Sequence, residues 1–334
     1  MAKRQEDNRV EGSSLARARG GFESVIVVTG AAGFIGRHLA RYLLRHTEET
    51  IVGLDNLYRS SWAGLTPHER LVTVTGDIRA AEELGRVFSG AQLVFHLAGL
   101  SQVMDSVWDQ DYAFSANVVG TFNVLRAARL AGVRHVVFTS SREVYGEAPR
   151  LPVSETATLT AKNPYGASKI ACEAYCRVFD SDEMRVSVVR LANVYGPGDR
   201  GRVIPIFIEC ALRGLPLVLH GGQQVIDFVP VRTVVEALWR VSRQPPGEPI
   251  NVGSGRGVRL PELAERIIRE TGSHSEMEMG PARSEEVVQF VADVSRMRAR
   301  LGIEVPPDSL SELAEQIALE RAEAMTLAGD LRGP

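Results

Sequence analysis

From Val25 to Leu191 the sequence alternates short runs of apolar, often β-branched residues with longer stretches that mix apolar and polar residues. The short runs are VIVVTG, IVGLD, LVTVTGD, LVFHLAG, HVVFTSS and RVSVVRL. Each is almost continuously apolar, which is typical of a strand covered on both faces of a sheet. Strands that alternate with helices predict an α/β fold with a doubly wound parallel sheet, and such a sheet binds ligands beyond the carboxyl ends of its strands.

The C-terminal part of the chain is organised differently, because prolines interrupt it often. They stand at positions 197, 205, 216, 230, 245, 246 and 249. We therefore expect a smaller C-terminal region over residues 196–334. It should contain helices over 261–271 and 311–326, and a strand near 249–252 that returns to the large sheet.

The first residues of the chain differ from both regions. Residues 1–22 are polar and rich in arginine, and they lack the apolar stretch of a secretory signal. We therefore expect a disordered leader, followed by a sheet domain over residues 23–195.

Charge and cysteine content exclude several classes of protein. The 334 residues carry a formal net charge of −3 with scattered lysines and arginines, which argues against a nucleic-acid partner. No apolar run approaches the roughly 18 to 20 residues that span a bilayer, so we expect no membrane anchor. Cys172, Cys176 and Cys210 have no metal-ligand spacing, and Cys172 and Cys176 are expected to be buried as small apolar side chains. These features predict a cytoplasmic protein without a bound metal.

A glycine-rich turn follows the first predicted strand. It has the sequence TGAAGFIG at residues 29–36 and opens the amphipathic stretch FIGRHLARYLL. Glycines spaced in this way allow a tight turn and bring backbone N–H groups close to a pyrophosphate at the N-terminus of a helix. The motif predicts a dinucleotide site of the Rossmann type. Its contributing residues are Gly30, Gly33, Phe34, Ile35 and Gly36.

Asp55 ends the second predicted strand, where a carboxylate reaches the 2′- and 3′-hydroxyls of the adenosine ribose in this fold. The same carboxylate repels a 2′-phosphate, and Asn56 rather than an arginine follows it, although Arg59 lies close by. We therefore predict NAD rather than NADP. Asn56 and the ends of the next two predicted strands add further residues to the cofactor site; those at the strand ends are Asp77, Ile78, Leu97, Ala98 and Gly99.

Two later segments carry a catalytic pattern. SSREVYG, at residues 140–146, follows the fifth predicted strand, and YGASK, at residues 165–169, opens a helix. Tyr165 and Lys169 are one helical turn apart and so share a face. A phenol ordinarily ionises near pH 10, and a neighbouring ammonium together with a cationic nicotinamide favours the phenolate, so this pair predicts a general base. Ser141 would hydrogen-bond the reacting oxygen.

In order, the segments TGAAGFIG, Asp55, Asp77-Ile78, HLAG, SSREVYG, YGASK and NVYGPG resemble the extended short-chain dehydrogenase/reductase family. Within it they are most similar to the NAD-dependent nucleotide-sugar epimerases and dehydratases of the UDP-glucose 4-epimerase type. The resemblance implies tightly held NAD and a triad of Ser141, Tyr165 and Lys169 that reversibly oxidises C4 of the sugar. It makes residues 23–195 the NAD-binding and catalytic domain, and residues 196–334 mainly the binding region for the nucleotide sugar.

The resemblance also assigns residues that no local pattern identifies. It places Asn117 near the cofactor and the catalytic loop, and Asn193 and Arg283 at the substrate diphosphate. Many relatives have an arginine at the position of Ile226, so one diphosphate contact is absent here or comes from elsewhere. The candidates for a substitute contact are Arg200 and Arg202.

Relatives of this type often dimerise through two paired helices. The corresponding stretches of this chain are residues 117–132 and 165–180. We therefore expect a homodimer whose other partner is a nucleoside-diphosphate sugar.

The choice of reaction depends on Arg142 and Glu143. A 4-epimerase needs only the triad and NAD, whereas dehydratases and decarboxylases of this family use extra groups, commonly a glutamate at the position of Glu143. Related 4,6-dehydratases usually have an aspartate where this chain has Arg142, so we favour a 4-epimerase of a UDP-hexose. Three alternatives stay open: a 4,6- or 5,6-dehydratase, a UDP-glucuronate decarboxylase using Glu143, and an NAD-binding module without catalysis. Arg142 could pair with Glu143 or with a substrate carboxylate.

Overall fold

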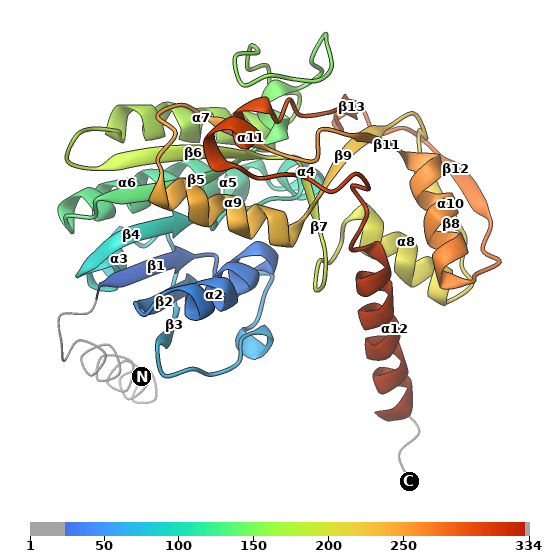
Figure 1. Cartoon of the computed structure of the whole chain (residues 1–334), viewed down its shortest axis with the longest axis horizontal. Helices are drawn as coiled ribbons and strands as arrows, with labels where there is room; N and C mark the ends of the chain where they lie inside the picture. Colours follow the sequence, from blue (N-terminus) through green and yellow to red (C-terminus); the bar gives the residue numbers. More distant parts are fainter. Residues whose placement is uncertain (1–23, 331–334) are drawn as a thin grey trace. The chain divides into compact units, whose positions relative to one another are not determined.

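The protein folds into two compact units that are interleaved along the chain. Figure 1 shows the computed structural model, which describes residues 24–330, so the leader expected over residues 1–22 lies outside the described part. The first unit comprises Met1–Ser140, Pro164–Val189 and Leu238–Pro249. The second comprises Ser141–Asn163, Arg190–Ala237 and Ile250–Pro334. The units are therefore not consecutive halves of the sequence.

The central sheet has seven strands in the order β10-β6-β5-β4-β1-β2-β3. Their bounds are β1 (Val25–Thr29), β2 (Thr50–Asp55), β3 (Leu71–Thr75), β4 (Ala91–His96), β5 (His135–Ser141), β6 (Arg185–Leu191) and β10 (Ile250–Val252). This is the doubly wound parallel arrangement predicted from the sequence, and β10 is the strand expected to return to the sheet. The strand order changes direction between β1 and β4, which is where such sheets bind dinucleotides.

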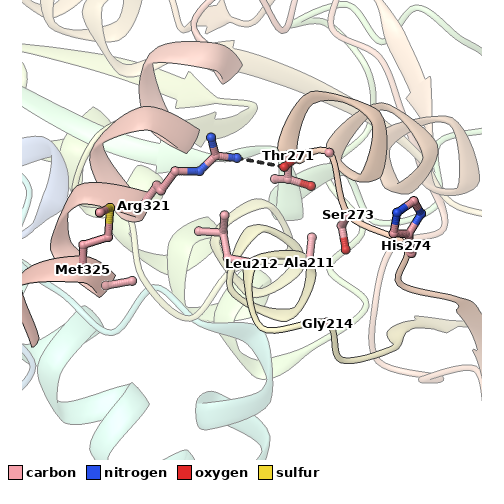
Figure 2. A pocket seen from close by; sticks show the side chains of 10 residues that line it. Ala211, Leu212, Gly214, Thr271, Ser273, His274, Arg321 and Met325 are labelled. Carbon is pink, nitrogen blue, oxygen red and sulfur yellow. Dashed lines mark hydrogen bonds between the residues drawn. The ribbon is translucent and has the colours of Figure 1, made fainter. Parts of the chain in front are cut away.

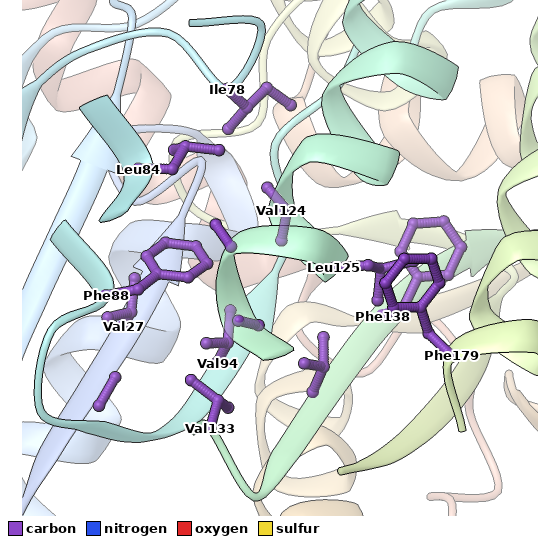
Figure 3. Close-up of a cluster of buried hydrophobic side chains, with 14 of the residues drawn as sticks. Val27, Ile78, Leu84, Phe88, Val94, Val124, Leu125, Val133, Phe138 and Phe179 are labelled. Carbon is purple, nitrogen blue, oxygen red and sulfur yellow. The ribbon is translucent and has the colours of Figure 1, made fainter. Parts of the chain in front are cut away.

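Helices alternate with these strands in the first unit. They are α2 (Phe34–His46), α3 (Ala81–Phe88), α4 (Val103–Trp108), α5 (Gln110–Phe114), α6 (Gly120–Leu130) and α7 (Pro164–Phe179), with a 3₁₀ turn η1 (Trp62–Gly64) and a π-helical turn η2 (Ser115–Val119). Leu84 of α3, Val124 of α6 and Cys172 of α7 pack against Val27 and Phe138 of the strands in one core cluster (Figure 3). The neighbours of Val27 in β1 are also buried and face the other side, because successive strand residues alternate. Both faces of the sheet are therefore covered.

The cysteines of α7 belong to this core. Cys172 and Cys176 are 0% and 1% exposed and form no disulfide. Burial raises the pKa of both thiols, so both stay protonated at neutral pH. This confirms that they serve as small apolar side chains.

The second unit is built from short strands and helices. They are η3 (Arg142–Tyr145), β7 (Asn193–Tyr195), α8 (Val203–Leu212), β8 (Leu217–His220), β9 (Val225–Pro230), α9 (Val231–Arg243), β11 (Gly257–Arg259), α10 (Leu260–Thr271), β12 (Met277–Gly280), β13 (Gln289–Phe290), α11 (Ser295–Leu301) and α12 (Leu313–Asp330). Strand β9 is the centre of a four-stranded sheet, and β12 pairs with β8. Helices α10 and α12 match the two that the sequence predicted, and α12 extends beyond the predicted end.

The buried carboxylate of Asp227 joins the loops of the second unit. It is 0% exposed and accepts hydrogen bonds from Ser254 N and Oγ, Gly255 N and Ala292 N at 2.6 to 3.1 Å. Burial raises its pKa, and these donors partly offset that effect. The preceding Ile226, 8% exposed, packs in the apolar core of this unit. An apolar residue thus fits this position, where many relatives have an arginine.

Candidate active site

The glycine-rich turn between β1 and α2 brings backbone atoms so close together that only glycine fits there. Gly30 has a φ of +72°, and a Cβ on it would lie 2.8 Å from Ala98 N. A Cβ on Gly36 would lie 2.0 Å from the carbonyl oxygen of Gly30. Gly33 precedes α2 without a side-chain cap, so the first turn of that helix keeps the character of an anion site. The predicted turn thus has the shape that a dinucleotide pyrophosphate requires.

Asp55 is fixed beside this turn at the end of β2. Its Oδ2 accepts from Ala32 N at 3.0 Å, and its Oδ1 accepts from Leu57 N at 2.8 Å and from Ser60 Oγ at 2.9 Å. A carboxylate offers about four acceptor positions, so capacity remains for a ribose hydroxyl. Arg59, the residue that could have favoured a 2′-phosphate, forms an ion pair with Asp105. The geometry therefore fits NAD at the predicted residue.

Asp77 and Asn56 connect the ends of β3 and β2. Asn56 Nδ2 donates to Asp77 Oδ2 at 3.1 Å, and Arg79 Nη2 donates to the same oxygen at 2.7 Å. Burial alone would raise the pKa of Asp77, but the hydrogen bonds from Arg79 and Asn56 outweigh it and lower the pKa to about 2. Asp77 is therefore ionised at neutral pH. The adjacent Ile78 packs in the core cluster, 6% exposed.

A histidine that the sequence did not single out holds the ends of β1 and β4 together. His96 is fully buried, its Nδ1 lies 2.8 Å from Thr29 Oγ1, and its Nε2 lies 2.9 Å from Thr121 Oγ1. Burial, with a smaller effect of Lys169, lowers its pKa to about 3, so the ring is neutral. A histidine inside an otherwise apolar strand was the available signal. This bridge supports the loop Leu97–Gly99 that the sequence assigned to the cofactor.

Asn117 lies in the π-helical turn η2. Its side chain connects the loop after β4 to α7 by hydrogen bonds. Its Oδ1 accepts from Leu100 N at 2.7 Å, and its Nδ2 donates to Leu100 O at 3.1 Å and to Ser168 Oγ at 2.8 Å. A Cβ on Gly99, whose φ is +154°, would lie 2.7 Å from Asn117 Oδ1. Single π-turns of this kind occur often at functional sites. Asn117 thus lies beside the loop that the sequence assigned to the cofactor, and its amide is bonded to protein atoms.

Tyr165 and Lys169 lie on one face of α7, as the sequence predicted. Both are buried, with 7% and 5% of their surface exposed. Lys169 Nζ donates to the carbonyl oxygen of Thr139 at 2.9 Å and lies 5.9 Å from the centre of the Tyr165 ring. It also lies 4.7 Å from the ring centre of Phe138. The Lys169 Nζ therefore lies close to the ring of Tyr165 in a buried environment.

Ser141, Arg142 and Glu143 form one continuous turn in the second unit. Ser141 ends β5, and its Oγ accepts from Glu143 N at 3.2 Å. The Glu143 side chain, 4% exposed, has Oε1 2.9 Å from Arg142 Nη2 and accepts at Oε2 from Asn163 Nδ2 at 2.8 Å. Both carboxylate oxygens of Glu143 are therefore engaged. Of the two pairings open to Arg142, the structure shows the one with Glu143.

The arginines assigned to the substrate diphosphate each pair with a nearby acid. Arg202 Nη1 lies 3.2 Å from Asp199 Oδ1, and Arg283 Nη1 lies 2.9 Å from Glu286 Oε1. The side chain of Arg200 is 81% exposed and lies 3.7 Å from a carboxylate oxygen of α12. The described residues thus show these arginines in separate ion pairs rather than gathered at one site.

Asn193, the first residue of β7, differs from those arginines. Its Oδ1 is buried and has no hydrogen-bond partner among the residues that the structure describes. A buried polar atom without a partner costs free energy, so this oxygen fits a position that a ligand completes. The resemblance assigned this same residue to the substrate.

Figure 2 shows a pocket of the second unit. It is lined by the ends of α8 and α10 and by α12, where Arg321 Nη2 donates to the carbonyl oxygen of Thr271 at 2.8 Å. None of the residues predicted for the site lines it. Within residues 24–330 no group of three or more histidine, cysteine or acidic side chains could hold a metal ion, and no helix is long and apolar enough to span a membrane.

Comparison with known proteins shows the family to which this chain is related. A family model described as the NAD dependent epimerase/dehydratase family matches residues 26–253. A UDP-glucose 4-epimerase of Mycolicibacterium smegmatis is 37% identical over 83% of this chain and 92% of its own length.

Solved structures of the same kind superpose closely. The UDP-glucose 4-epimerase of Thermotoga maritima, solved with UDP-glucose, is 29% identical with a TM-score of 0.85 and covers 90% of this chain and 99% of its own. A dTDP-glucose 4,6-dehydratase of Streptomyces venezuelae, solved with NAD, is 29% identical with a TM-score of 0.86 and covers 90% and 98%. The chain belongs to the NAD-dependent epimerase/dehydratase family and is an NAD-dependent enzyme.

Proposed function

We propose that this enzyme is a 4-epimerase of UDP-hexoses that acts by transient oxidation at C4. The observation that carries the proposal is the state of Glu143, whose two carboxylate oxygens are held by Arg142 and Asn163. A dehydratase or decarboxylase of this family needs an additional acid or base at that turn, and here the acid is already an ion-pair partner. The UDP-glucose 4-epimerases among the relatives support the same choice.

The catalytic step that we assign to the chain is proton transfer at the 4-hydroxyl. NAD, when bound, supplies the acceptor for the C4 hydride and its source on return. Tyr165 takes the hydroxyl proton as a phenolate and gives it back, and the Lys169 ammonium stabilises that phenolate. Ser141 donates a hydrogen bond to the C4 oxygen. The 4-keto sugar must present its other face between the two transfers for C4 to be inverted.

The cofactor contacts that we propose follow from the geometry of the first unit. Gly30, Gly33 and the first turn of α2, at Phe34, Ile35 and Gly36, would hold the pyrophosphate. Asp55 would hold the adenosine ribose. The ends of β2, β3 and β4 would line the rest of the cofactor: Asn56, Asp77, Ile78, Leu97, Ala98, Gly99 and Asn117.

A labelling experiment separates the reactions. The purified protein is incubated with UDP-glucose or UDP-galactose in deuterated water, and the product is analysed by mass and by NMR. We expect inverted C4, unchanged mass and no deuterium on carbon, because both proton transfers occur at oxygen. Loss of water with deuterium at C5, abolished in Glu143→Gln, would establish a dehydratase instead. Loss of carbon dioxide from UDP-glucuronate would establish a decarboxylase, and no turnover of any nucleotide sugar would leave an NAD-binding module.

We further propose that Asn193, Arg202 and Arg283 bind the substrate diphosphate. The unpartnered Oδ1 of Asn193 supports a contact with a hydrogen-bond donor of the substrate, and the Nδ2 of the same amide would donate to a diphosphate oxygen. An arginine fork matches phosphate oxygens in geometry and charge. Binding would require Arg202 and Arg283 to exchange their carboxylate partners for the substrate.

We also propose a homodimer formed through α6 and α7. Large apolar side chains on the outer faces of η2 and these helices are exposed to solvent: Val119, Leu130, Tyr175 and Val178. Apolar patches of this kind commonly mark a protein interface. Val178→Glu should give a monomer in light scattering coupled to size exclusion, whereas Met279→Glu, on the second unit, should leave a dimer. A wild-type monomer would disprove the proposal.

A cytoplasmic location is the remaining proposal, and the cysteines support it. All three are free, and Cys172 and Cys176 are buried in the core, where disulfide chemistry plays no part. Fractionation of cells that produce the protein, followed by immunodetection, tests the location.

A further inference from the structure

Glu173 is a buried acid that the proposed mechanism leaves without a task. It lies on α7, and only 4% of its surface is exposed. Tyr165, Lys169 and Glu173 follow one another at intervals of four residues, so they share one face of the helix. An acid thus stands one turn beyond the catalytic lysine.

A short hydrogen bond joins this acid to the end of β5. Ser140 Oγ donates to Glu173 Oε1 at 2.5 Å, and Ser140 is 3% exposed. This length is typical of a hydroxyl bonded to an ionised carboxylate. The preceding residue, Thr139, accepts from Lys169 Nζ at 2.9 Å. Two consecutive residues of the strand are therefore tied to two consecutive turns of α7.

Charge gives the second reason to link Glu173 with Lys169. A buried ion is costly unless an opposite charge is close. The other titratable groups near Lys169 are His96 of β4, neutral because burial lowers its pKa to about 3, and the protonated thiols of Cys172 and Cys176 on α7. None of these three groups carries a negative charge, so we assign the negative charge on this face of α7 to the Glu173 carboxylate.

We infer that Ser140 and Glu173 are positioning residues of the reaction. Their bond holds the end of β5 against α7, so that the Lys169 ammonium stays beside Tyr165 and the backbone that leads into Ser141 keeps its place. The Glu173 carboxylate also balances the lysine charge. This inference rests on the proposed function, because the base that it positions is the base of that reaction.

The test compares Glu173→Gln, Ser140→Ala and the double variant with the control Glu183→Gln, which alters an exposed glutamate of the same unit. We expect Glu173→Gln to lower kcat about 10- to 100-fold, less than the roughly 10²- to 10⁴-fold expected for loss of the base itself, with KM changed by less than about threefold. Its pH profile should move to lower pH, because loss of a buried negative charge favours the phenolate and disfavours the ammonium. Ser140→Ala should lower kcat less and leave the profile in place. The double variant should be no slower than Glu173→Gln, because the two residues act as one unit.

Hydrogen exchange supplies a measurement that does not depend on turnover. Amides at the end of β5 and in the following turn η3, residues 139–145, should exchange faster in Ser140→Ala and Glu173→Gln than in the control. Wild-type kcat, pH profile and exchange in both variants would overturn the inference. If Glu173→Gln does not fold, Ser140→Ala decides alone, because it removes a single hydroxyl. Failure of the wild-type enzyme to epimerise UDP-hexoses would count against the proposed function. The exchange data would still test whether the bond between Ser140 and Glu173 holds the end of β5 against α7.

Discussion

The two units hold their predicted site residues in different ways. In the first unit, Gly36 and Asp55 are fixed by contacts with neighbouring backbone atoms. Neither residue would have to move for the proposed dinucleotide to bind. In the second unit, Arg202 and Arg283 are paired with Asp199 and Glu286. The residues proposed for the cofactor are thus held in place by backbone geometry, whereas the arginines proposed for the substrate would have to exchange their carboxylate partners. The contrast teaches that the reaction should be sensitive to small changes in the first unit and tolerant of many in the second.

The largest effect should come from the base itself. Tyr165→Phe removes the proton acceptor and keeps the ring, so we expect kcat to fall about 10²- to 10⁴-fold. NAD content and thermal unfolding should stay close to wild type. The control is Tyr175→Phe, an exposed tyrosine of the same helix, which should retain full activity. Near-normal turnover in a folded Tyr165→Phe protein would show that another residue is the base.

The preformed turn offers the next largest effect. Gly36→Ala places a methyl group 2.0 Å from the Gly30 carbonyl oxygen, so the turn must open. We expect a loss of roughly 3 kcal/mol in the free energy of unfolding, as for other overpacked sites, and loss of bound NAD. Gly85→Ala in α3 is the control, because its Cβ meets nothing within 4 Å and alanine favours a helix. Equal stability of the two variants, measured by denaturant unfolding, would refute a rigid turn.

The next prediction concerns Asp55, which we propose binds the adenosine ribose of the cofactor. Asp55→Ala removes an acceptor from the ribose hydroxyls and a charge that repels a 2′-phosphate. We expect NAD binding to weaken about tenfold or more, and NADP binding to weaken less or improve, since a hydrogen bond to a charged group contributes about 1.5–3 kcal/mol. Calorimetric titration of nucleotide-free protein measures both, with the exposed Asp111→Ala as the control. A wild-type preference for NADP that the substitution leaves unchanged would show that Asp55 does not select the cofactor.

The same contrast explains how much the sequence could predict. The alternation of apolar runs predicted the parallel sheet, and the TGAAGFIG motif predicted a tight turn before a helix, because sterics and hydrogen bonding act between near neighbours there. The partners of Arg283 and Arg202 are acids only three residues away, but neither pair lies within a helix, so the spacing alone did not identify them. The bridge of His96 and the bond between Ser140 and Glu173 join segments far apart in sequence. Only the one-face spacing of Glu173 with Lys169 could have indicated the latter.

A diphosphate role for the second unit is tested at Arg283. Arg283→Ala should raise KM for a UDP-hexose about five- to tenfold with kcat nearly unchanged, because it removes binding shared by ground state and transition state. Glu286→Gln should lower KM slightly, since it removes the competing carboxylate. Arg213→Ala, which breaks a surface pair with Glu209, is the control and should change neither constant. If Arg283→Ala leaves KM unchanged, Arg283 does not bind the substrate.

The smallest expected effect concerns the free energy of unfolding. It compares an acid of the second unit, Glu320, with an acid of the first unit, Asp77. Glu320 of α12 has a pKa raised to about 7 by burial and by the neighbouring carboxylates of Asp199, Glu323 and Glu209, although a hydrogen bond from Gln316 opposes this. An acid whose pKa is raised on folding favours the folded state fully below its unfolded pKa, near 4.5, and this contribution is lost as the pH rises to about 7. Asp77, lowered to about 2, behaves oppositely and contributes stability above its unfolded pKa of 3.8.

Glu320→Gln should therefore stabilise the protein at pH 8 by about 1 kcal/mol, the shift being discounted for solvent screening. The gain should disappear near pH 4.5, where the wild-type side chain is also neutral. Asp77→Asn should destabilise the protein at pH 8, because it removes the carboxylate that Arg79 and Asn56 hold. Denaturant unfolding at the two pH values measures both variants. If Glu320→Gln changes the free energy of unfolding equally at pH 8 and pH 4.5, the ionised carboxylate of Glu320 does not destabilise the folded protein. The second unit would then contain no destabilising charge at this position.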